Sequence, residues 1–474
     1  MSRQNKTGPV TEVETTGPVS SGTQEILNYI EKHDLTSVLN DAVNKLCREK
    51  PDNPWDFLAV EIENKNPCQI SKLEAHEILD SRGNPTIEVS LYVGSKILSR
   101  GSAPSGASTG SNEALELRDG DEDRYMGKGT LKAVENVNNI LSESLQSMDP
   151  RNLRACDEAL CKADGTQLKE NIGGNAITAS SFAIAEAGAK LNKIELFQHF
   201  ANAFHQNSAG LRYVTTVYHH LGKILVESYG KSARNLGDEG GFAPPLKDAN
   251  EALKCIEKAI ETAGFQCGTD IFLALDCAAS EFYHEEKKQY EISPGKYLDS
   301  TALIGFYENL VKDHPALVSI EDGLHEKDYE GWINLTERLS SIMCVGDDLY
   351  TTNTDLIKKG IKEKWANALL LKVNQIGTIS EAMEAARLVF AEKCNVIVSH
   401  RSGETPGSLI ADLAVGIGAQ YIKTGAPARG ERISKYNRLL QIENFLKSHD
   451  LLFVNETPID ADGSQTDVNL SEVH

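Results

Sequence analysis

The second half of the chain repeats one unit six times: a short apolar run that ends in a charged or polar residue, in most cases followed by a helix-like stretch. Continuous apolar strands joined by helical crossovers are typical of a parallel sheet that is covered on its faces. The six runs are IFLALD (271–276), LVSIED (317–322), MCVGDD (343–348), ALLLKV (368–373), NVIVSH (395–400) and YIKTGA (421–426). The sequence therefore predicts an α/β domain built on a β/α barrel.

The ends of these runs predict a site. In a β/α barrel the carboxyl ends of the strands meet on one face, where the working residues lie. A solvated strand end would explain one polar residue, but six in succession favour a shared site. The candidates are Asp276, Glu321, Asp347, Lys372, His400 and Lys423. Three carboxylates without Cys or His among them suit a hard, oxygen-seeking cation such as Mg²⁺ better than zinc.

The region before the barrel predicts a second domain. The segment LEAHEILDSRGNPTIEVSLYVG alternates polar and apolar residues around a turn at 81–85, as a meander of strands does. Helical segments follow, and strands followed by helices are typical of an α+β domain. We therefore expect an α+β capping domain over residues 69–205, a barrel domain over 206–455 and a C-terminal tail over 456–474.

The N-terminus has a different texture. Residues 1–22 are rich in Thr, Ser, Gly and Pro, which predicts a disordered tail. Residues 23–65 predict two short amphipathic helices or one bent helix, broken near Asp34, followed by another short helix that begins near Trp55. Helices of this size cannot bury their apolar faces alone. Ending in KPDNPWDFLAVEI, this segment resembles the RIIa-type dimerisation and docking module of the cyclic-AMP-dependent kinase regulatory subunit. The resemblance implies an amphipathic-helix partner; a helical extension packed on its own enzyme is the alternative.

Composition excludes several classes of function. The net charge of −21 argues against nucleic acid or an anionic membrane as the main partner. Nine scattered cysteines, without metal-ligand spacing, indicate reduced thiols in the cytosol. No apolar run approaches the roughly 20 residues of a membrane span. We expect a cytoplasmic protein.

Longer strings resemble one family, the enolases. They are LLLKVNQIGT, SHRSGET, IKTGAPARGER, GDEGGFAP, DSRGNPTIEV, PSGASTG, MGKG and LDCAASEF, which follow the family's order from about residue 71 to about 443. The resemblance implies a capping domain followed by an enolase-type barrel, and a homodimer. It also implies the reversible, Mg²⁺-dependent dehydration of 2-phospho-D-glycerate to phosphoenolpyruvate, with two Mg²⁺ ions per site.

The resemblance assigns roles to positions. Lys372 matches the base that removes the C2 proton, and Glu239 the acid that helps the C3 hydroxyl to leave, with His400 also in the catalytic set. The expected ligands of the first Mg²⁺ are Asp276, Glu321 and Asp347, and that of the second is Ser108. The expected substrate-binding residues are Arg401 and Ser402 at the phosphate and Lys423 at the carboxylate. Cations in these places would stabilise the negative charge that develops as the proton leaves.

One stretch departs from the family. The residues between about Phe200 and Asn235 contain a helix-like YHHLGKIL, but not the two strands that open an enolase barrel or the glutamate that they supply. Removing two strands would leave unpaired edges in the barrel. Three explanations compete: a truncated splice form or gene-model error, a contracted barrel with weak activity, or a non-catalytic relative kept as a scaffold.

Two hypotheses of function result. The first is a glycolytic phosphopyruvate hydratase. The second is a weakly active or inactive enolase-like scaffold, tethered through residues 23–65 to a partner in a cytoskeletal or ciliary assembly. Both hold together if the N-terminal helices localise an active enzyme.

Overall fold

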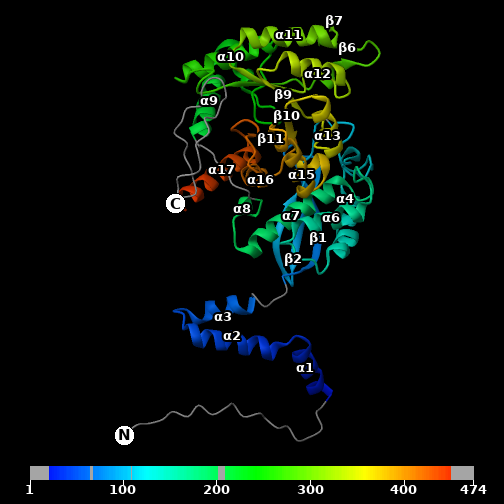
Figure 1. Ribbon diagram of the computed structural model, residues 1–474, viewed down its shortest axis with the longest axis vertical. Helices are drawn as coiled ribbons and strands as arrows, with labels where there is room; N and C mark the ends of the chain where they lie inside the picture. Colours follow the sequence, from blue (N-terminus) through cyan, green and yellow to red (C-terminus); the bar gives the residue numbers. More distant parts are fainter. Residues whose placement is uncertain (1–20, 64–67, 108, 201–208, 450–474) are drawn as a thin grey trace. The chain divides into compact units, whose positions relative to one another are not determined.

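The computed structural model describes residues 21–63, 68–107, 109–200 and 209–449 (Figure 1). The chain divides into two compact units, Met1–Cys68 and Gln69–His474. The tails predicted over residues 1–22 and 456–474 lie outside the described residues, except that Ser21 and Gly22 begin the first helix.

The first unit consists of three helices, so two short helices and not one bent helix precede the last: α1 (Ser21–Lys32), α2 (Leu35–Glu49) and α3 (Pro54–Glu63). Asp34, in a left-handed conformation with φ 47°, separates α1 from α2, so the predicted break is confirmed. The side chain of Asn53 accepts hydrogen bonds from the amides of Trp55 and Asp56, and Pro54 occupies the first turn, where its missing N–H has no cost. Ala42 is the one buried hydrophobic residue among the described residues of this unit.

The second unit opens with the predicted α+β region. The strands β1 (Ile70–Leu79), β2 (Pro85–Val93) and β3 (Lys96–Ser102) form an antiparallel sheet in chain order. The helical elements after it are η1 (Tyr125–Gly127), α4 (Leu131–Asn136), η2 (Val137–Leu141), α5 (Ser142–Leu145), α6 (Leu153–Asp164) and α7 (Gly174–Asn192). The α7 helix packs on β3, and Gly101 permits this because a Cβ there would collide with the backbone of Ala179.

The six predicted barrel strands are confirmed. They are β4 (Leu273–Asp276), β8 (Leu317–Glu321), β9 (Met343–Gly346), β10 (Ala368–Leu371), β11 (Asn395–Ser399) and β12 (Tyr421–Lys423). They form one curled, parallel half-barrel sheet in the order β12-β11-β10-β9-β8-β4. Every residue of the central β10 is buried, whereas the edges are open: Phe272, which precedes β4, is 52% exposed and Tyr421 in β12 is 45% exposed. The half-barrel thus has two free edges in the part of the chain that is described.

Helices surround this sheet (Figure 1). They are α8 (Leu196–Phe200), α9 (Ala209–Tyr229), η3 (Lys231–Arg234), α10 (Ala249–Thr262), η4 (Ala279–Phe282), α11 (Ser300–Asp313), α12 (Tyr329–Arg338), α13 (Thr354–Glu363), α14 (Val373–Ile376), α15 (Ile379–Ala391), α16 (Leu409–Ile417) and α17 (Gly430–Ser448). Side-chain caps start several of them: Asp248, Asp299 and Asn353 accept backbone amides of α10, α11 and α13. A small sheet of β5 (Tyr283–His284), β6 (Gln289–Ser293) and β7 (Lys296–Leu298) precedes α11.

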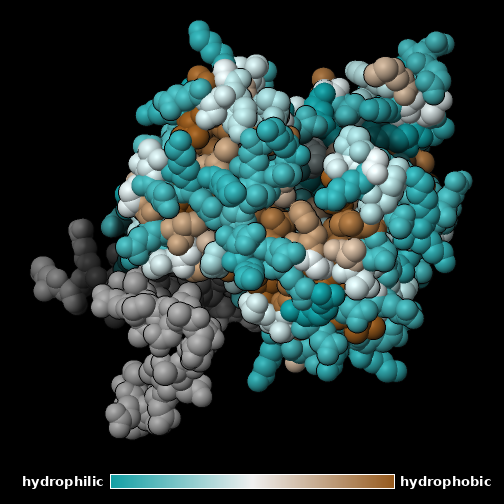
Figure 2. Space-filling view, turned by 90° about the horizontal axis from the view of Figure 1, so that it is seen from above, coloured by the Kyte–Doolittle hydropathy of each residue, from teal (hydrophilic) through white to brown (hydrophobic). Residues whose placement is uncertain are grey.

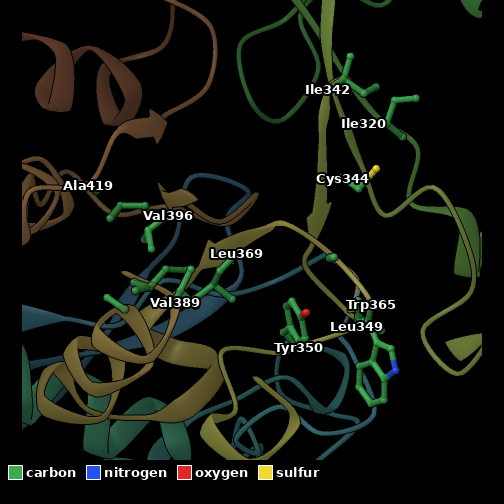
Figure 3. Packing of buried hydrophobic residues seen from close by; sticks show 14 of the residues in the cluster. Ile320, Ile342, Cys344, Leu349, Tyr350, Trp365, Leu369, Val389, Val396 and Ala419 are labelled. Atoms are coloured by element: carbon green, nitrogen blue, oxygen red, sulfur yellow. The ribbon is translucent and has the colours of Figure 1, made fainter. Parts of the chain in front are cut away.

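The main core lies between the half-barrel and its helices. Figure 3 shows Leu369 and Val396, from β10 and β11, beside Val389 of α15. Trp365 is fully buried and stacks against Tyr329 and, at a longer distance, Tyr350. Seen from the side that carries α10, α11 and α12, the surface is mostly hydrophilic with smaller hydrophobic patches (Figure 2). Within the described residues, no helix has the length and apolarity that crossing a bilayer requires.

Candidate active site

Two of the predicted metal ligands meet at one side of the half-barrel. Strands β4 and β8 are paired so that Asp276 lies opposite Glu321. The Lys423 Nζ, at the end of β12, donates to Asp276 Oδ2 at 2.6 Å and to both oxygens of Glu321 at 2.9 Å. One ammonium group therefore joins the two edge strands of the sheet at their carboxyl ends.

The third predicted ligand, Asp347, lies directly after β9. Its Oδ2 pairs with Lys372 Nζ, and its Oδ1 accepts a hydrogen bond from Gln375 Nε2 at 2.8 Å. Gln375 is fixed in turn by the hydroxyl of Thr352 at 2.8 Å. Gln375 was not predicted as a site residue, although it lies in the string LLLKVNQIGT. It holds the carboxylate that faces the predicted base.

A polar cavity of about 70 Å³ brings most of the predicted residues together. Eight of them line it: Glu239, Asp276, Asp347, Lys372, His400, Arg401, Ser402 and Lys423. Glu321 is bound to Lys423 at the same place, and Ala107 lines the cavity from the preceding domain. The predicted ligand Ser108 lies outside the described residues.

The electrostatics of the carboxylates fit a cation. Burial raises the pKa of Glu321 to about 8, and the Asp276 and Asp347 carboxylates raise it too, while Lys423 acts in the opposite sense. Burial also disfavours the charge on Asp347, but Lys372 outweighs it, so the pKa of Asp347 is lowered. Two ammonium groups thus face three crowded carboxyl groups, which leaves the cluster short of positive charge. Their oxygen donors suit Mg²⁺, which would supply the positive charge that the cluster needs.

A second group of carboxylates lies next to the first. Ligand oxygens of Asp322, Asp347 and Asp348 lie within 4.8 Å of one another. The two oxygens of Asp322, however, accept the backbone amides of Asp347 and Asp348, each at 2.9 Å. Asp322 therefore fixes the loop that presents Asp347. Burial and the charge of Asp347 raise the pKa of Asp348 to about 7.

The pKa of Glu239 is shifted in the opposite direction from those of Glu321 and Asp348. Ser402 Oγ donates to its Oε1 at 2.8 Å, and His400 Nε2 lies 3.2 Å from its Oε2. His400, and to a lesser extent Ser402, hold the pKa of Glu239 well below its usual range although burial opposes this. Among the described residues that line the cavity, Glu239 is the one glutamate. Because the pKa of Glu239 is lowered, its protonated form is scarce near neutral pH.

The predicted phosphate residue Arg401 already has a carboxylate partner. Its guanidinium donates to Glu113 Oε2 at 2.8 Å and to Asn374 at 3.3 Å, and Arg401 is 4% exposed. Glu113 comes from the capping region, 288 residues away in the sequence, and was not predicted. An anion that binds Arg401 must compete with Glu113.

The capping region also touches the loop that carries Arg401 and Ser402. The Ser81 amide donates to Glu404 O at 2.8 Å, and Ser105 and Gly403 exchange backbone hydrogen bonds at 2.7 and 2.8 Å. The turn at 80–85 and Ser105 thus contact the loop that carries Arg401 and Ser402, and Ala107 lines the cavity beside it.

Comparisons with known proteins agree with this arrangement. Family models described as the enolase N-terminal domain and the enolase C-terminal TIM barrel domain match residues 70–200 and 183–455. The chain belongs to the enolase family. Relatives named enolase from Pyrococcus furiosus and Thermococcus gammatolerans are 47% and 46% identical to it, over 420 and 418 residues. In each case the similarity covers 81% of this chain and 96% of the relative.

The enolase models leave the first unit unmatched, since neither includes residues before 70. Both the expected family and the expected enolase fold class are confirmed. The assignment of individual residues to catalysis, substrate and metal stays a prediction, to which the geometry adds Glu113, Asp322 and Gln375 as supporting residues.

Proposed function

We propose that this chain catalyses the reversible dehydration of 2-phospho-D-glycerate to phosphoenolpyruvate, as a magnesium-dependent phosphopyruvate hydratase. The observation that carries the proposal is one cavity lined by two lysines and a glutamate together with aspartates, a histidine and an arginine. Because the chain belongs to the enolase family, we interpret this combination of side chains as an enolase active site.

Proton removal is assigned to Lys372. Its Nζ, when deprotonated, takes the C2 proton, and the electron pair of that C–H bond is first delocalised into the substrate carboxylate. The same electron pair then forms the C2–C3 double bond as the C3–O bond breaks. Negative charge develops on the substrate carboxylate before the hydroxyl leaves. Lys423, which lies between Asp276 and Glu321, is the cation assigned to that carboxylate.

Proton delivery is assigned to Glu239. Its carboxyl gives a proton to the departing C3 hydroxyl, which leaves as water. His400 and Ser402 orient this carboxyl but also favour its ionised form. The step that breaks the C–O bond should therefore be slow relative to the exchange of the C2 proton.

Asp276, Glu321 and Asp347 are the proposed ligands of the first Mg²⁺, and Ser108 of the second. Bound there, Mg²⁺ would supply positive charge next to the substrate carboxylate, where negative charge develops. Arg401 and Ser402 are proposed to bind the phosphate, which would then replace the contact of Arg401 with Glu113.

Purified protein with Mg²⁺ and 2-phosphoglycerate should produce phosphoenolpyruvate, measured by its ultraviolet absorbance. Lys372→Ala should abolish the signal, whereas Lys364→Ala, a change at an exposed lysine, should not. A wild-type rate equal to that of Lys372→Ala would exclude the proposal.

The gap in the barrel is part of the proposal. The alignments to the relatives span 420 and 418 positions, against 81% of 474 residues from this chain, which supports an internal deletion. We propose that the deletion lies where the capping domain (69–205) meets the barrel domain (206–455), before the first described barrel strand. Sequencing the transcript across residues 200–235 distinguishes a skipped segment from a chain that lacks the two strands.

The N-terminal helices support a second, compatible function as a docking module. Several large apolar residues of this unit are exposed, which is unusual for a surface that binds no partner. They are Ile26, Leu27, Tyr29, Leu39, Val43, Trp55 and Ile62. We propose that an amphipathic helix of a partner covers them, and that the enolase body forms a homodimer as the family implies. Copurified partners that disappear when residues 1–66 are removed would support docking, and an unchanged set of partners would exclude it.

We place the enzyme in the cytoplasm. Attachment to a cytoskeletal or ciliary structure follows only if the docking module binds a component of one, which localisation of the full chain and of the chain without residues 1–66 would reveal.

A further inference from the structure

Arg432, in the first turn of α17, lies behind the acid side of the cavity rather than in its lining. Its side chain is fully buried. The Nη2 group donates to the backbone oxygen of Asp238 at 3.0 Å and to that of Ser402 at 2.7 Å. One nitrogen atom therefore ties the loop that carries Glu239 to the loop that carries Ser402.

Both tied carbonyls adjoin the contacts that orient the Glu239 carboxylate. The residue after Asp238 is Glu239 itself, and Ser402 provides the hydroxyl that donates to Glu239 Oε1. The Glu239 backbone is held from a third side, because the amide of Ala426 donates to Glu239 O at 3.0 Å. Moving either loop would change the direction in which the carboxylate points.

Gly425 allows this close packing. A Cβ at Gly425 would lie 2.8 Å from Arg432 Cδ and 2.8 Å from Glu239 O, and its φ of +78° also favours glycine. The stem of Arg432 thus passes directly against the backbone of Gly425, beside Glu239. The IKTGAPARGER string supplies both the glycine and the arginine.

The arginine is not explained by the stability of the fold. Its Nε and Nη1 groups are buried and have no hydrogen-bond partner among the described residues. Buried donors without partners are costly, and an apolar side chain of similar length would fill the space without that cost. The charged side chain is better explained by what Nη2 holds in place.

We propose that Arg432 is a positioning residue for the acid step, which fixes the Glu239 carboxylate against Ser402 by clamping the two loops. The inference rests on the proposed hydratase function. It concerns the step in which the C3 hydroxyl leaves and assigns Arg432 no contact with substrate.

The test compares wild type, Arg432→Met, Arg432→Lys and the control Arg438→Met. Arg438 lies on the same helix but binds the carboxylates of Asp412 and Glu195 instead of the loops of the site. A displacement of about 1 Å at a catalytic group can cost on the order of 10²-fold in rate, which is the fall in kcat expected for Arg432→Met. The KM for 2-phosphoglycerate and the affinity for Mg²⁺ without substrate should change far less. Arg432→Lys should recover part of the rate, since an ammonium group can donate to both carbonyls.

Two further comparisons separate the outcomes. In a Glu239→Gln background, Arg432→Lys should lower kcat little further, because both substitutions act on the same step. Additive losses of kcat would mean that Arg432 acts elsewhere. This cycle also decides the matter if Arg432→Met does not fold. An active wild type with equal kcat for Arg432→Met and Arg438→Met overturns the inference. Absence of turnover in the wild type would instead contradict the proposed hydratase function.

Discussion

Replacing Lys423 by methionine removes the ammonium that joins Asp276 to Glu321, and the structure predicts two opposite effects. Breaking a buried ion pair from one side costs about 3–5 kcal/mol. The Asp276 side chain is 45% exposed and Glu321 8%, so solvent screens one of the two contacts. We therefore expect a loss of about 3 kcal/mol in the free energy of unfolding without Mg²⁺. Binding of Mg²⁺ should at the same time tighten, because the ammonium no longer competes for the carboxylates.

The tightening of Mg²⁺ binding is limited by the ion-pair energy that the substitution removes. If about 1.4 kcal/mol of that energy opposes the metal in the wild type, the dissociation constant for Mg²⁺ should fall about tenfold in Lys423→Met. Thermal unfolding at increasing Mg²⁺ concentration measures both quantities. Lys169→Met is the matched control, since buried Lys169 binds the partly exposed Glu381 at 2.8 Å away from the site. It should lower stability and leave the response to Mg²⁺ unchanged. Equal or weaker Mg²⁺ binding by Lys423→Met would show that the ammonium does not compete with the metal.

Three further predictions concern other parts of the chain. Burial raises the pKa of Asp157 to about 6, against about 3.9 in an unfolded chain, so stability is lost as the pH rises through this window. Asp157→Asn should therefore stabilise the protein by about 3 kcal/mol near pH 8 and lose this gain towards pH 4, as urea unfolding at both pH values would show. Arg401→Lys should raise the KM for 2-phosphoglycerate in steady-state kinetics on the order of tenfold, since lysine cannot bind a phosphate with a planar fork; an unchanged KM would contradict the phosphate assignment. Removing residues 1–66 should leave kcat unchanged and abolish binding of the helical partner; a fall in kcat would indicate that these helices pack on the enzyme.

The barrel strands could be predicted because each is a short apolar run that ends in a polar residue. Strand β10 shows why: all of its residues are buried, so its sequence is apolar on both faces. The break at Asp34 was predictable for a similar reason, since the apolar spacing changes there. Local patterns of this kind need no knowledge of distant residues.

The supporting residues of the site could not be found in this way. Glu113 pairs with Arg401 across 288 residues, and Arg432 acts through backbone carbonyls, which carry no signal in the sequence. Asp322 looks like a ligand beside Glu321, but its oxygens are engaged by the amides of the next strand end. Asp322 also lines the cavity, and only the three-dimensional arrangement shows that its oxygens fix the loop of Asp347.

We propose that Lys372 removes the C2 proton and that proton delivery by Glu239 is the slower step. Incubating the protein with Mg²⁺ and 2-phosphoglycerate in heavy water and following the C2 proton by nuclear magnetic resonance tests both assignments. We predict that this proton exchanges for deuterium faster than phosphoenolpyruvate forms. The exchange should persist in Glu239→Gln and be lost in Lys372→Ala. Absence of both exchange and phosphoenolpyruvate in the wild type, or exchange that survives Lys372→Ala, would contradict these assignments.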